Sequence, residues 1–599
     1  MAVNLSPLAG AGWQFFDNSG VILSGGLLYT YASGTTTPQA TYTSSSGSTA
    51  NSNPIVLDSA GRISSEIWLT QGQSCKFVLK TSTGTTIWTY DNVPGINDQT
   101  GLLAFETSLA ASSGSSLVGF MPAGTSAVAT TTQAKLRQIV SAIDFGAVGN
   151  GATDDTAAIQ AALNYAASLG GSLYIPTGAY KLTSTLTVSF GVEIYGDSPI
   201  IPSTALTAPT KGTWLYFAHN NVGINISVNN GFNIEKIGTY RSTQVLPALG
   251  SGTYTPTTQA ADIAITTNDY SSFCNITLLN PFIGIQHSGT GGIFVENVLM
   301  NPLNIGISID NCYDTCYLNN IHIWPFWTGV TQYTSWNYTI ANLRAILLFH
   351  ADNPFLSNIF TIFAYTGLEF SSTTYGGASK AHVSNCDFDR GRVGIYVSAD
   401  NVTAQFENIT IQGEFTTPAG ANVNGIVIIS AGCYLQFGSL DIRNVGEYGI
   451  QATAASTSGT IYVDNLTVIG YGAVASAAQA VYASNSAFNF YITGNPNIIN
   501  GGGASAYAAT LKGLGWYYTD VTGSRVIGTT YTNTLNRPMF VTISGTNTSA
   551  GNALFYLDGN QIQSTTLSAA GYCSFASYVP PQSTYKVTGF TSILRWTES

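Results

Sequence analysis

The sequence predicts an all-β protein whose central part is a parallel β-helix, and three observations lead to this prediction. Between residues 273 and 450 a short motif occurs five times, and we call it the phrase. It consists of an Asn followed by a small or aliphatic residue and, nine positions after the Asn, a Gly followed by an apolar residue. Apolar residues alternate between the two landmarks, which is typical of strands. The phrases start 22, 23, 38 and 27 residues apart, and a period of 20 to 50 residues indicates a solenoid.

The two landmarks predict how neighbouring rungs stack. A sixth Asn, Asn408, follows 23 residues after the fifth, with its Gly displaced to Gly425 by an insertion at 415–424. We expect the Asn side chains to form an amide ladder at a turn, and each Gly to supply backbone freedom at the next corner. The five complete phrases are Asn275/Gly284, Asn297/Gly306, Asn320/Gly329, Asn358/Gly367 and Asn385/Gly394.

Composition excludes several classes of function. Only 8% of the 599 residues are charged, and 30 Asp and Glu stand against 19 Lys and Arg, a net charge of −11. This acidic balance argues against nucleic acid or an anionic membrane surface as partner. The amino terminus lacks a basic start and a long apolar core, and no stretch reaches the length of a membrane helix, so neither a secretory signal nor a membrane span is expected.

The seven cysteines are scattered without a disulfide framework. Only Cys312 and Cys316 lie close together, and a CxxxC spacing without a nearby His pair is poor for zinc. We therefore expect buried free thiols, no metal and no cofactor.

Residues 1–99 read as short strands between turn clusters, which predicts a small β-domain. The stretches "GGLLYTYASGTTTPQATYT", "NPIVLDSAGR" and "IWLTQGQSCKFVL" resemble the amino-terminal virion-attachment domain of bacteriophage tailspike and tail-fibre proteins. The resemblance implies that this domain attaches the protein to the phage tail, baseplate or adaptor proteins.

Residues 100–142 are rich in Ala, Ser, Gly and Thr and predict a neck with a short helix, in which Leu136, Ile139 and Val140 share one face. A second helix is predicted over 157–168, opened by Asp154 and Asp155, which we interpret as capping carboxylates rather than a catalytic or metal-binding pair. The stretch "SSGSSLVGFMPAGTSAVATTTQAKLRQIVSAIDFGAVGNGATDDTAAIQAAL" resembles the entry into the pectate-lyase-like right-handed parallel β-helix of phage tailspikes.

The β-helix is predicted to occupy 143–510, and alternating strands over 511–599 predict a β-sandwich. The stretches "GWYYTDVTGSRVIGTTYTNTLNRPMFVTISG" and "NALFYLDGN" resemble the small carboxy-terminal sandwiches of phage spikes, which hold trimers together or contact glycan.

Aligning the rungs by their Asn predicts which side chains leave the core. Cys386, Phe388, Ile409 and Ile411 should point inward, and the residues between them should face solvent on one sheet. The outward pairs are, rung by rung, Thr277/Leu279, Leu299/Asn301, His322/Trp324, Phe360/Ile362, Asp387/Asp389, Thr410/Gln412 and Asp441/Arg443. One face therefore carries an aromatic part followed by a part with carboxylates and arginines.

Glycan cleavage usually needs two carboxylates, one to protonate the leaving oxygen and one to activate water or attack. The catalytic candidates are Asp387, Asp389, Glu414 and Asp441; Glu369 and Glu447 are alternatives elsewhere on the rungs. The competing interpretation is that these aspartates only keep the sheet soluble. Against it, Asp is a poor strand former, yet "CDFDRGR" places two in one strand.

The neighbours of these carboxylates suggest separate roles. Asp389, nearest the arginine-rich turn, should stay ionised and act as base, whereas Asp387 or Glu414, facing Phe360 and Ile362, is the better acid because desolvation raises its pKa. Sugar rings stack on aromatic faces, and arginines orient hydroxyl or carboxyl groups. The candidates for substrate binding are His322, Trp324, Phe360, Arg390, Arg392, Gln412 and Arg443.

Taken together, the resemblance implies a phage tailspike. Such a protein is a homotrimer of the virion tail, made in the host cytoplasm and released by lysis, that binds and depolymerises a capsule, exopolysaccharide or O-antigen during adsorption. Two alternatives remain: a receptor-binding fibre without catalysis, and a pectate-type lyase, which would use Ca²⁺ and basic residues. The few Lys and Arg residues count against the lyase.

Overall fold

The computed structural model divides the chain into two compact units, residues 1–138 and 139–599, which are described separately. The described residues are 2–8, 12–96, 100–204, 206–227, 231–247, 253–266, 269–325, 333–377, 380–413, 423–475, 478–493, 496–500, 505–507, 519–535, 538–567 and 571–598.

The first unit begins with the small β-domain that the sequence predicts. An antiparallel sheet in the order β3-β2-β5-β6 packs over a core that includes the fully buried side chains of Leu28, Leu69 and Phe77. The strands are β1 Val3–Leu5, β2 Leu27–Ala32, β3 Ile55–Val56, β4 Trp68–Thr70, β5 Cys75–Lys80 and β6 Thr86–Val93.

The neck differs from the prediction in its helices. The longer helix is α1, Thr100–Ala110, which sequence reasoning missed, and α2 spans only Thr132–Leu136. The expected helical face of Leu136, Ile139 and Val140 is wrong, because Val140 leaves the helix and pairs in parallel with Leu173 of the first rung. The remaining elements of the neck are η1 Gly114–Leu117, β7 Gly119–Phe120 and β8 Thr130–Thr131.

Helix α3, Thr156–Ser168, confirms the second predicted helix and covers the first rung with Ile159, Leu163 and Ala166. Asp154 accepts hydrogen bonds from Thr156 at the helix start, at 3.1 Å from its N–H. Asp155 is the N-cap residue by position, but its carboxylate does not cap the helix; it accepts the N–H groups of Val148 and Gly149. Both aspartates are therefore structural, although only Asp154 acts at the helix.

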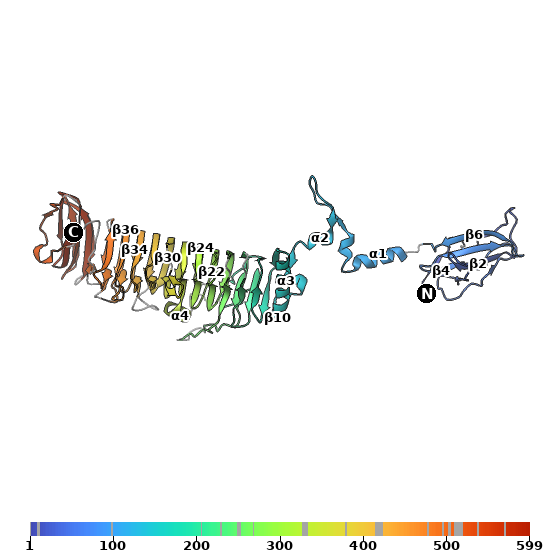
Figure 1. Ribbon diagram of the computed structural model, residues 1–599, viewed down its shortest axis with the longest axis horizontal. Coiled ribbons are helices and arrows are strands. Elements are labelled where there is room, and N and C mark those ends of the chain that lie inside the picture. Colours follow the sequence, from blue (N-terminus) through green and yellow to red (C-terminus); the bar gives the residue numbers. More distant parts are fainter. Residues whose placement is uncertain are drawn as a thin grey trace. The chain divides into compact units, whose positions relative to one another are not determined.

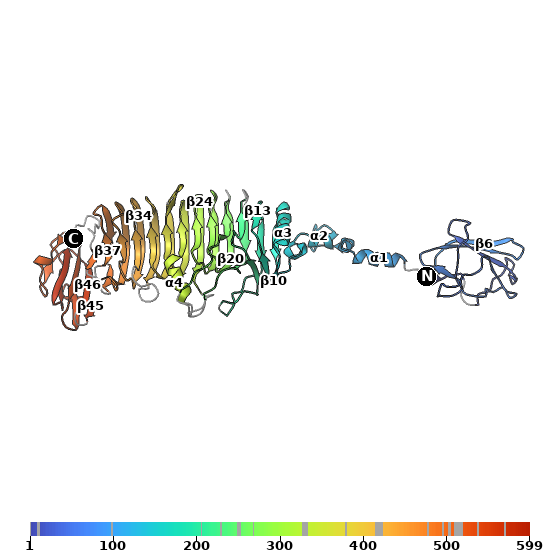
Figure 2. The ribbon, with the colours of Figure 1, turned by 90° about the horizontal axis from the view of Figure 1, so that it is seen from below.

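The second unit is a parallel β-helix followed by a β-sandwich, and Figures 1 and 2 show its rungs stacked side by side from α3 to β36. One continuous apolar core runs through the rungs. The strands of the long sheet are β9 Val140–Ser141, β10 Asn150–Asp154, β11 Ser172–Ile175, β12 Gly178–Leu182, β14 Glu193–Gly196, β15 Thr213–Phe217, β17 Phe232–Glu235, β18 Gly238–Arg241, β20 Ser271–Leu279, β22 Ile293–Met300, β24 Cys312–Ile323, β26 Ala351–Ile362, β30 Ala381–Gly391, β32 Thr403–Gly413, β34 Cys433–Arg443, β36 Gly459–Tyr471, β38 Phe488–Ile492 and β39 Asn497–Asn500.

A second parallel sheet closes the other side of the rungs. Its strands are β13 Leu186–Val188, β16 Ile224–Ile226, β19 Ala261–Ile265, β21 Ile283–His287, β23 Ile305–Ile309, β25 Arg344–Leu348, β27 Thr366–Phe370, β31 Val393–Val397, β33 Asn424–Ile428, β35 Ile450–Ala452, β37 Gln479–Ala483 and β40 Ser505–Tyr507. The connections include η2 Ala142–Phe145, α4 Tyr333–Asn342, β28 Ser372–Thr373 and β29 Gly376–Gly377.

Each landmark Asn bends a long strand, because it adopts a left-handed backbone conformation that Asn tolerates better than most residues. The φ angles lie between 52° and 56° at Asn275, Asn297, Asn320, Asn358, Asn385 and Asn408. The expected amide ladder is present in parts: Nδ2 of Asn320 donates to Oδ1 of Asn297 at 2.7 Å, and Asn408 donates to Asn385 at 3.0 Å. Asn358 instead donates to Asn319.

The landmark glycines serve a different purpose from the predicted one. They do not have positive φ; they allow close approach of the next rung, since a Cβ on Gly284 would lie 2.5 Å from the carbonyl oxygen of Gly306. Gly329 lies outside the described residues. The register places Ala345 beside Gly306 and Gly367, so Ala345, and not the predicted Gly329, occupies the matching position of the third rung.

The β-sandwich predicted at the carboxy terminus is confirmed by two antiparallel sheets, β41-β48-β43-β46 and β42-β47-β44-β45. Phe555, Phe575 and Trp596 lie in its core, and the Tyr578 hydroxyl donates to the carbonyl of Ile492 in the last rungs. Its elements are β41 Thr519–Asp520, η3 Thr522–Ser524, β42 Tyr531–Thr532, β43 Met539–Thr546, β44 Gly551–Leu557, β45 Asn560–Leu567, β46 Tyr572–Val579, β47 Thr584–Thr588 and β48 Ser592–Glu598.

The cysteines confirm the expectation of free thiols. All seven are unpaired in disulfides, and all are buried except Cys274, which is half-buried. None of the helices in the described ranges is long and apolar enough to cross a membrane.

Substitution of a landmark glycine tests the stacking. Gly284→Ala should lower the thermal unfolding temperature of the β-helix, because overpacking against a rigid backbone costs about 1–3 kcal/mol. Gly523→Ala is the matched control, since nothing lies within 4 Å of its Cβ position. Equal unfolding temperatures for the two variants would contradict close rung approach as the role of Gly284.

Candidate functional site

The predicted outward column is present in the structure. His322 pairs in register with Phe360, Phe360 with Asp387, Asp387 with Thr410, and Thr410 with Asp441. The inward positions are buried as expected, for example Cys386 and Ile409, and Figure 1 shows the corresponding strands β24, β30 and β34 as successive parts of one stack. Residues up to 119 positions apart in the chain thus lie along one face.

The rings of His322, Trp324 and Phe360 lie at the end of this column that is formed by the earlier rungs, and we call them the aromatic wall. The rings of His322 and Trp324 stack 5.5 Å apart at 10°, and the edge of Phe360 meets His322 at 5.0 Å and 81°. Trp324 is 41% exposed. Because burial lowers the pKa of His322, the imidazole is biased toward its neutral form and serves the wall as a ring rather than a cation.

Asp387 lies on the rung next to this wall, where it pairs in register with Phe360. It is half-buried, and its Oδ1 is buried without a hydrogen-bond partner among the described residues. Burial raises its pKa above the ordinary value of 3.8. A carboxyl that burial removes from water favours the protonated form.

Asp389 lies two residues farther along strand β30, on the same side of the sheet and half-buried. Arg390 follows it, with its guanidinium 5.7 Å from the centre of the Phe363 ring. Phe363 in turn stacks on Trp336 of helix α4 at 4.4 Å. Nε of Arg392 is buried and has no hydrogen-bond partner within the described part of the chain. Buried polar groups normally have partners, so Asp387 and Arg392 leave two positions that a ligand could satisfy.

Asp441 and Arg443, on the last strand of the column, form an ion pair with each other. Nη2 of Arg443 lies 2.7 Å from Oδ2 of Asp441, and Nε lies 2.9 Å from Oδ1. Gln412 lies between Asp389 and Arg443 in register. The sequence predicted separate roles for Asp441 and Arg443, but in the structure the two side chains form a bidentate ion pair with each other.

The other acidic candidates do not join the column. Glu414 lies outside the described residues, as does most of the predicted insertion. Glu369 is buried on the second sheet, 3.3 Å from Nε of Arg344. Glu447 accepts a hydrogen bond from Asn424 at 3.1 Å. No group of three or more His, Cys, Asp or Glu side chains in the described ranges is arranged to hold a metal ion.

A groove that the sequence did not predict continues the aromatic wall toward the first rungs. It has a volume of about 340 Å³ and is lined by His322, Leu299 and the amides of Asn275, Asn297 and Asn320. The repeating Asn could have indicated it, because a ladder of amides on one surface offers regularly spaced donors and acceptors. The groove and the column together form one open face with polar, aromatic and carboxylate parts.

Comparisons with known proteins find similarity over parts of the chain. Residues 139–350 match the family model described as rhamnogalacturonase A/epimerase, pectate lyase-like. The chain is 37% identical over 89 residues to the tail spike protein of Shigella phage Sf6, and 48% identical over 61 residues to a mannuronan C5-epimerase of Azotobacter vinelandii. Among solved structures, a tailspike protein variant of Escherichia coli bacteriophage HK620 in complex with pentasaccharide aligns over 83% of this chain and 99% of its own, with 12% identity and a TM-score of 0.40.

The sequence matches are local. They cover 14% of the tail spike protein and 3% of the epimerase, and 14% and 9% of this chain. The match to the family model agrees with the parallel rungs observed from β9 onward.

The titration of Asp387 can be measured through stability. The pKa of Asp387 is higher in the folded chain than its ordinary value of 3.8. The folded protein therefore loses stability as the pH rises from 3.8 through the pKa of Asp387 in the folded state. Asp387→Asn does not titrate, so its unfolding temperature should rise relative to the native protein between pH 3 and pH 7.

The matched control for that measurement is Glu407→Gln, which makes the same change from carboxylate to amide at an exposed position of the neighbouring strand β32. A pH-independent difference between Asp387→Asn and the native protein would show that Asp387 is not desolvated.

Proposed function

We propose that this protein is a phage tailspike that binds and cleaves a bacterial surface polysaccharide by glycosidic hydrolysis on the outward column of the β-helix. One observation carries the proposal: Asp387 is a half-buried carboxyl with a raised pKa, and its Oδ1 has no hydrogen-bond partner among the described residues. It adjoins the aromatic wall in register and lies two residues from a second carboxyl, Asp389. Paired carboxylates with different environments are the usual machinery for this reaction.

Asp387 is the general acid. Its protonated carboxyl donates a proton to the glycosidic oxygen, and the bond from that oxygen to the anomeric carbon breaks. Asp389 is the general base and takes a proton from a water molecule, whose oxygen attacks the anomeric carbon. The products are two shorter chains, one with a new reducing end, and the acid is restored by proton exchange with solvent.

The strand geometry favours inversion at the anomeric carbon. Side chains two residues apart on a strand are separated by ~6.6 Å, which falls within the ~6.5–9.5 Å that leaves room for a water between the carboxyls of an inverting enzyme. The aromatic wall would hold a sugar above the cleaved bond. Arg392, whose Nε is buried without a partner among the described residues, is placed to contact a hydroxyl or carboxyl group of the glycan.

Two alternatives give different products. A lyase product carries a new double bond that absorbs in the ultraviolet, and a receptor-binding fibre leaves the polysaccharide intact. The family model includes pectate-lyase-like proteins, so the product must be analysed directly. Incubation with host surface polysaccharide followed by mass spectrometry distinguishes the added water of hydrolysis from the unsaturated lyase product and from unchanged chains.

Amide substitutions test the two carboxyls. Asp387→Asn and Asp389→Asn should each lower turnover ~10²-fold or more while binding persists, because they remove proton transfer and keep the shape of the side chain. Glu407→Gln is the control of the same kind on the neighbouring strand and should retain full activity. Full activity in both aspartate variants would remove this column from catalysis.

We further propose that the protein acts as a trimer attached to the phage tail by residues 1–99. Helix α1 exposes Leu102, Leu103, Phe105 and Leu109, and an isolated helix of this length is marginal in water unless its apolar side chains are covered. The outward aromatic residues Tyr317 and Phe355 of the long sheet are also exposed. Self-association would cover both surfaces.

Deletion of residues 1–99 separates attachment from glycan chemistry. The shortened chain should retain a trimeric mass in light scattering and full cleavage, because its rungs contain their own core, but it should not be incorporated into phage particles. The full chain should show three times the 63.0 kDa of one copy. A monomeric mass for the full chain, or loss of cleavage in a trimeric deletion variant, would contradict the proposal.

A further inference from the structure

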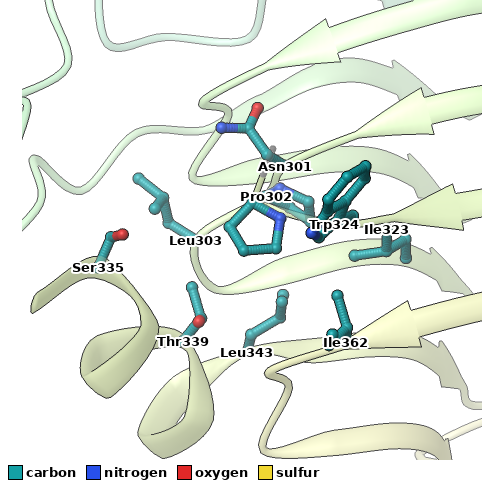
Figure 3. Close-up of a pocket in the computed structure, with 10 residues that line it drawn as sticks. Asn301, Pro302, Leu303, Ile323, Trp324, Ser335, Thr339, Leu343 and Ile362 are labelled. Carbon is teal, nitrogen blue, oxygen red and sulfur yellow. The ribbon is translucent and has the colours of Figure 1, made fainter. Parts of the chain in front are cut away.

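A small apolar pocket lies at the edge of the aromatic wall, between helix α4 and the ends of successive rungs. Figure 3 shows Thr339 and Leu343 on the helix side and Pro302, Trp324 and Ile362 on the rung side. Its free volume of about 10 Å³ is close to that of one water-sized group. The pocket can therefore accept a single small substituent but not a sugar ring.

The lining favours an apolar occupant. Pro302, Leu303, Trp324, Leu343 and Ile362 contribute hydrocarbon surface. Two of the polar oxygens in the lining already have partners. Oγ1 of Thr339 donates to the carbonyl of Trp336, and Oδ1 of Asn301 accepts the N–H of Asn280. A hydroxyl group placed here would lose its hydrogen bonds to water, whereas a methyl group would gain from leaving water.

The pocket adjoins the surface on which a sugar would lie. Trp324 forms part of its lining and also presents an exposed indole to solvent. Trp324 precedes Ile362 by one rung, and Ile362 pairs in register with Asp389. A sugar stacked on Trp324 would therefore lie two rungs from the carboxylates, with a substituent beside the pocket.

We propose that this pocket binds the methyl group of a substituted sugar, so that the site selects glycans carrying a 6-deoxyhexose or an acetylated sugar at this position. The inference rests on the proposed function, because it requires a glycan on the aromatic wall. The shared chemistry is a methyl group that leaves water next to Trp324.

Binding of free sugars to the full chain, measured by saturation-transfer NMR, tests the inference. The pairs L-fucose and L-galactose, and L-rhamnose and L-mannose, differ by a methyl or hydroxymethyl group, and N-acetylglucosamine differs from N-formylglucosamine by one methyl. We expect the methylated member of at least one pair to bind about tenfold more tightly, with its methyl protons most strongly saturated. The pair that shows the preference identifies the source of the methyl, and equal binding within every pair overturns the inference.

Substitutions in the pocket lining test whether the pocket causes the preference for the methylated sugar. Thr339→Ile replaces the hydroxyl group with a larger ethyl group, which fills the pocket, and should abolish the methyl preference while leaving the unmethylated sugar unchanged. Thr339→Val has nearly the volume of Thr and should keep the preference. Ser335→Val fills the pocket from another turn of α4 and should give the same result as Thr339→Ile, so misfolding of one variant, detected by thermal unfolding, does not decide the outcome.

Trp324→Ala distinguishes glycan binding on the aromatic wall from methyl binding in the pocket. It should weaken both members of each pair, because it removes the surface on which either sugar stacks, and it should also reduce the methyl preference, because Trp324 lines the pocket. If Trp324→Ala weakens both sugars but the pocket-filling variants keep the methyl preference, the methyl pocket is wrong and the glycan wall stands. If Trp324→Ala changes no binding, both the wall and the pocket are overturned.

Discussion

The register between neighbouring rungs is the constraint on which the rest of this structure depends. It is set at two points in each rung, an Asn in the left-handed conformation that bends the long strand and a Gly that lets the next backbone approach. Because side chains alternate with a period of two, a shift of one residue would exchange every buried and exposed position of a rung. The continuous core from α3 to the last rungs is therefore possible only while these bends stay aligned.

The candidate site follows from this alignment rather than from any local motif. Phe360 and Asp387 are 27 residues apart in the chain, yet the register makes them neighbours, and burial raises the pKa of this carboxyl. The same column continues to Asp441, which pairs with Arg443 and so differs in environment from Asp387 although both are outward aspartates. The two environments differ because of what adjoins each aspartate: Asp387 pairs in register with Phe360, whereas Asp441 contacts Arg443.

The sequence predicted the column well because the Asn spacing measures the length of each rung directly. The prediction was wrong where an insertion lengthens a rung. Gly329 has the expected spacing from Asn320, but helix α4 intervenes and Ala345 occupies the matching position. It also missed helix α1, since propensity is a weak guide in an Ala- and Ser-rich stretch. The contact between Asp441 and Arg443 and the pocket beside Thr339 depend on side-chain conformation and on packing of α4, which periodicity does not report.

In the proposed function, the glycan lies on the outward column from Trp324 to Asp389, with Asp387 at the cleaved bond. A crystal structure of the Asp387→Asn variant grown with an oligosaccharide from the host polysaccharide would show where the glycan binds. We expect a sugar stacked on Trp324 and a glycosidic oxygen within hydrogen-bonding distance of residue 387. An oligosaccharide bound on another face, for example beside Tyr317 and Phe355, with residue 387 free of contact, would contradict it.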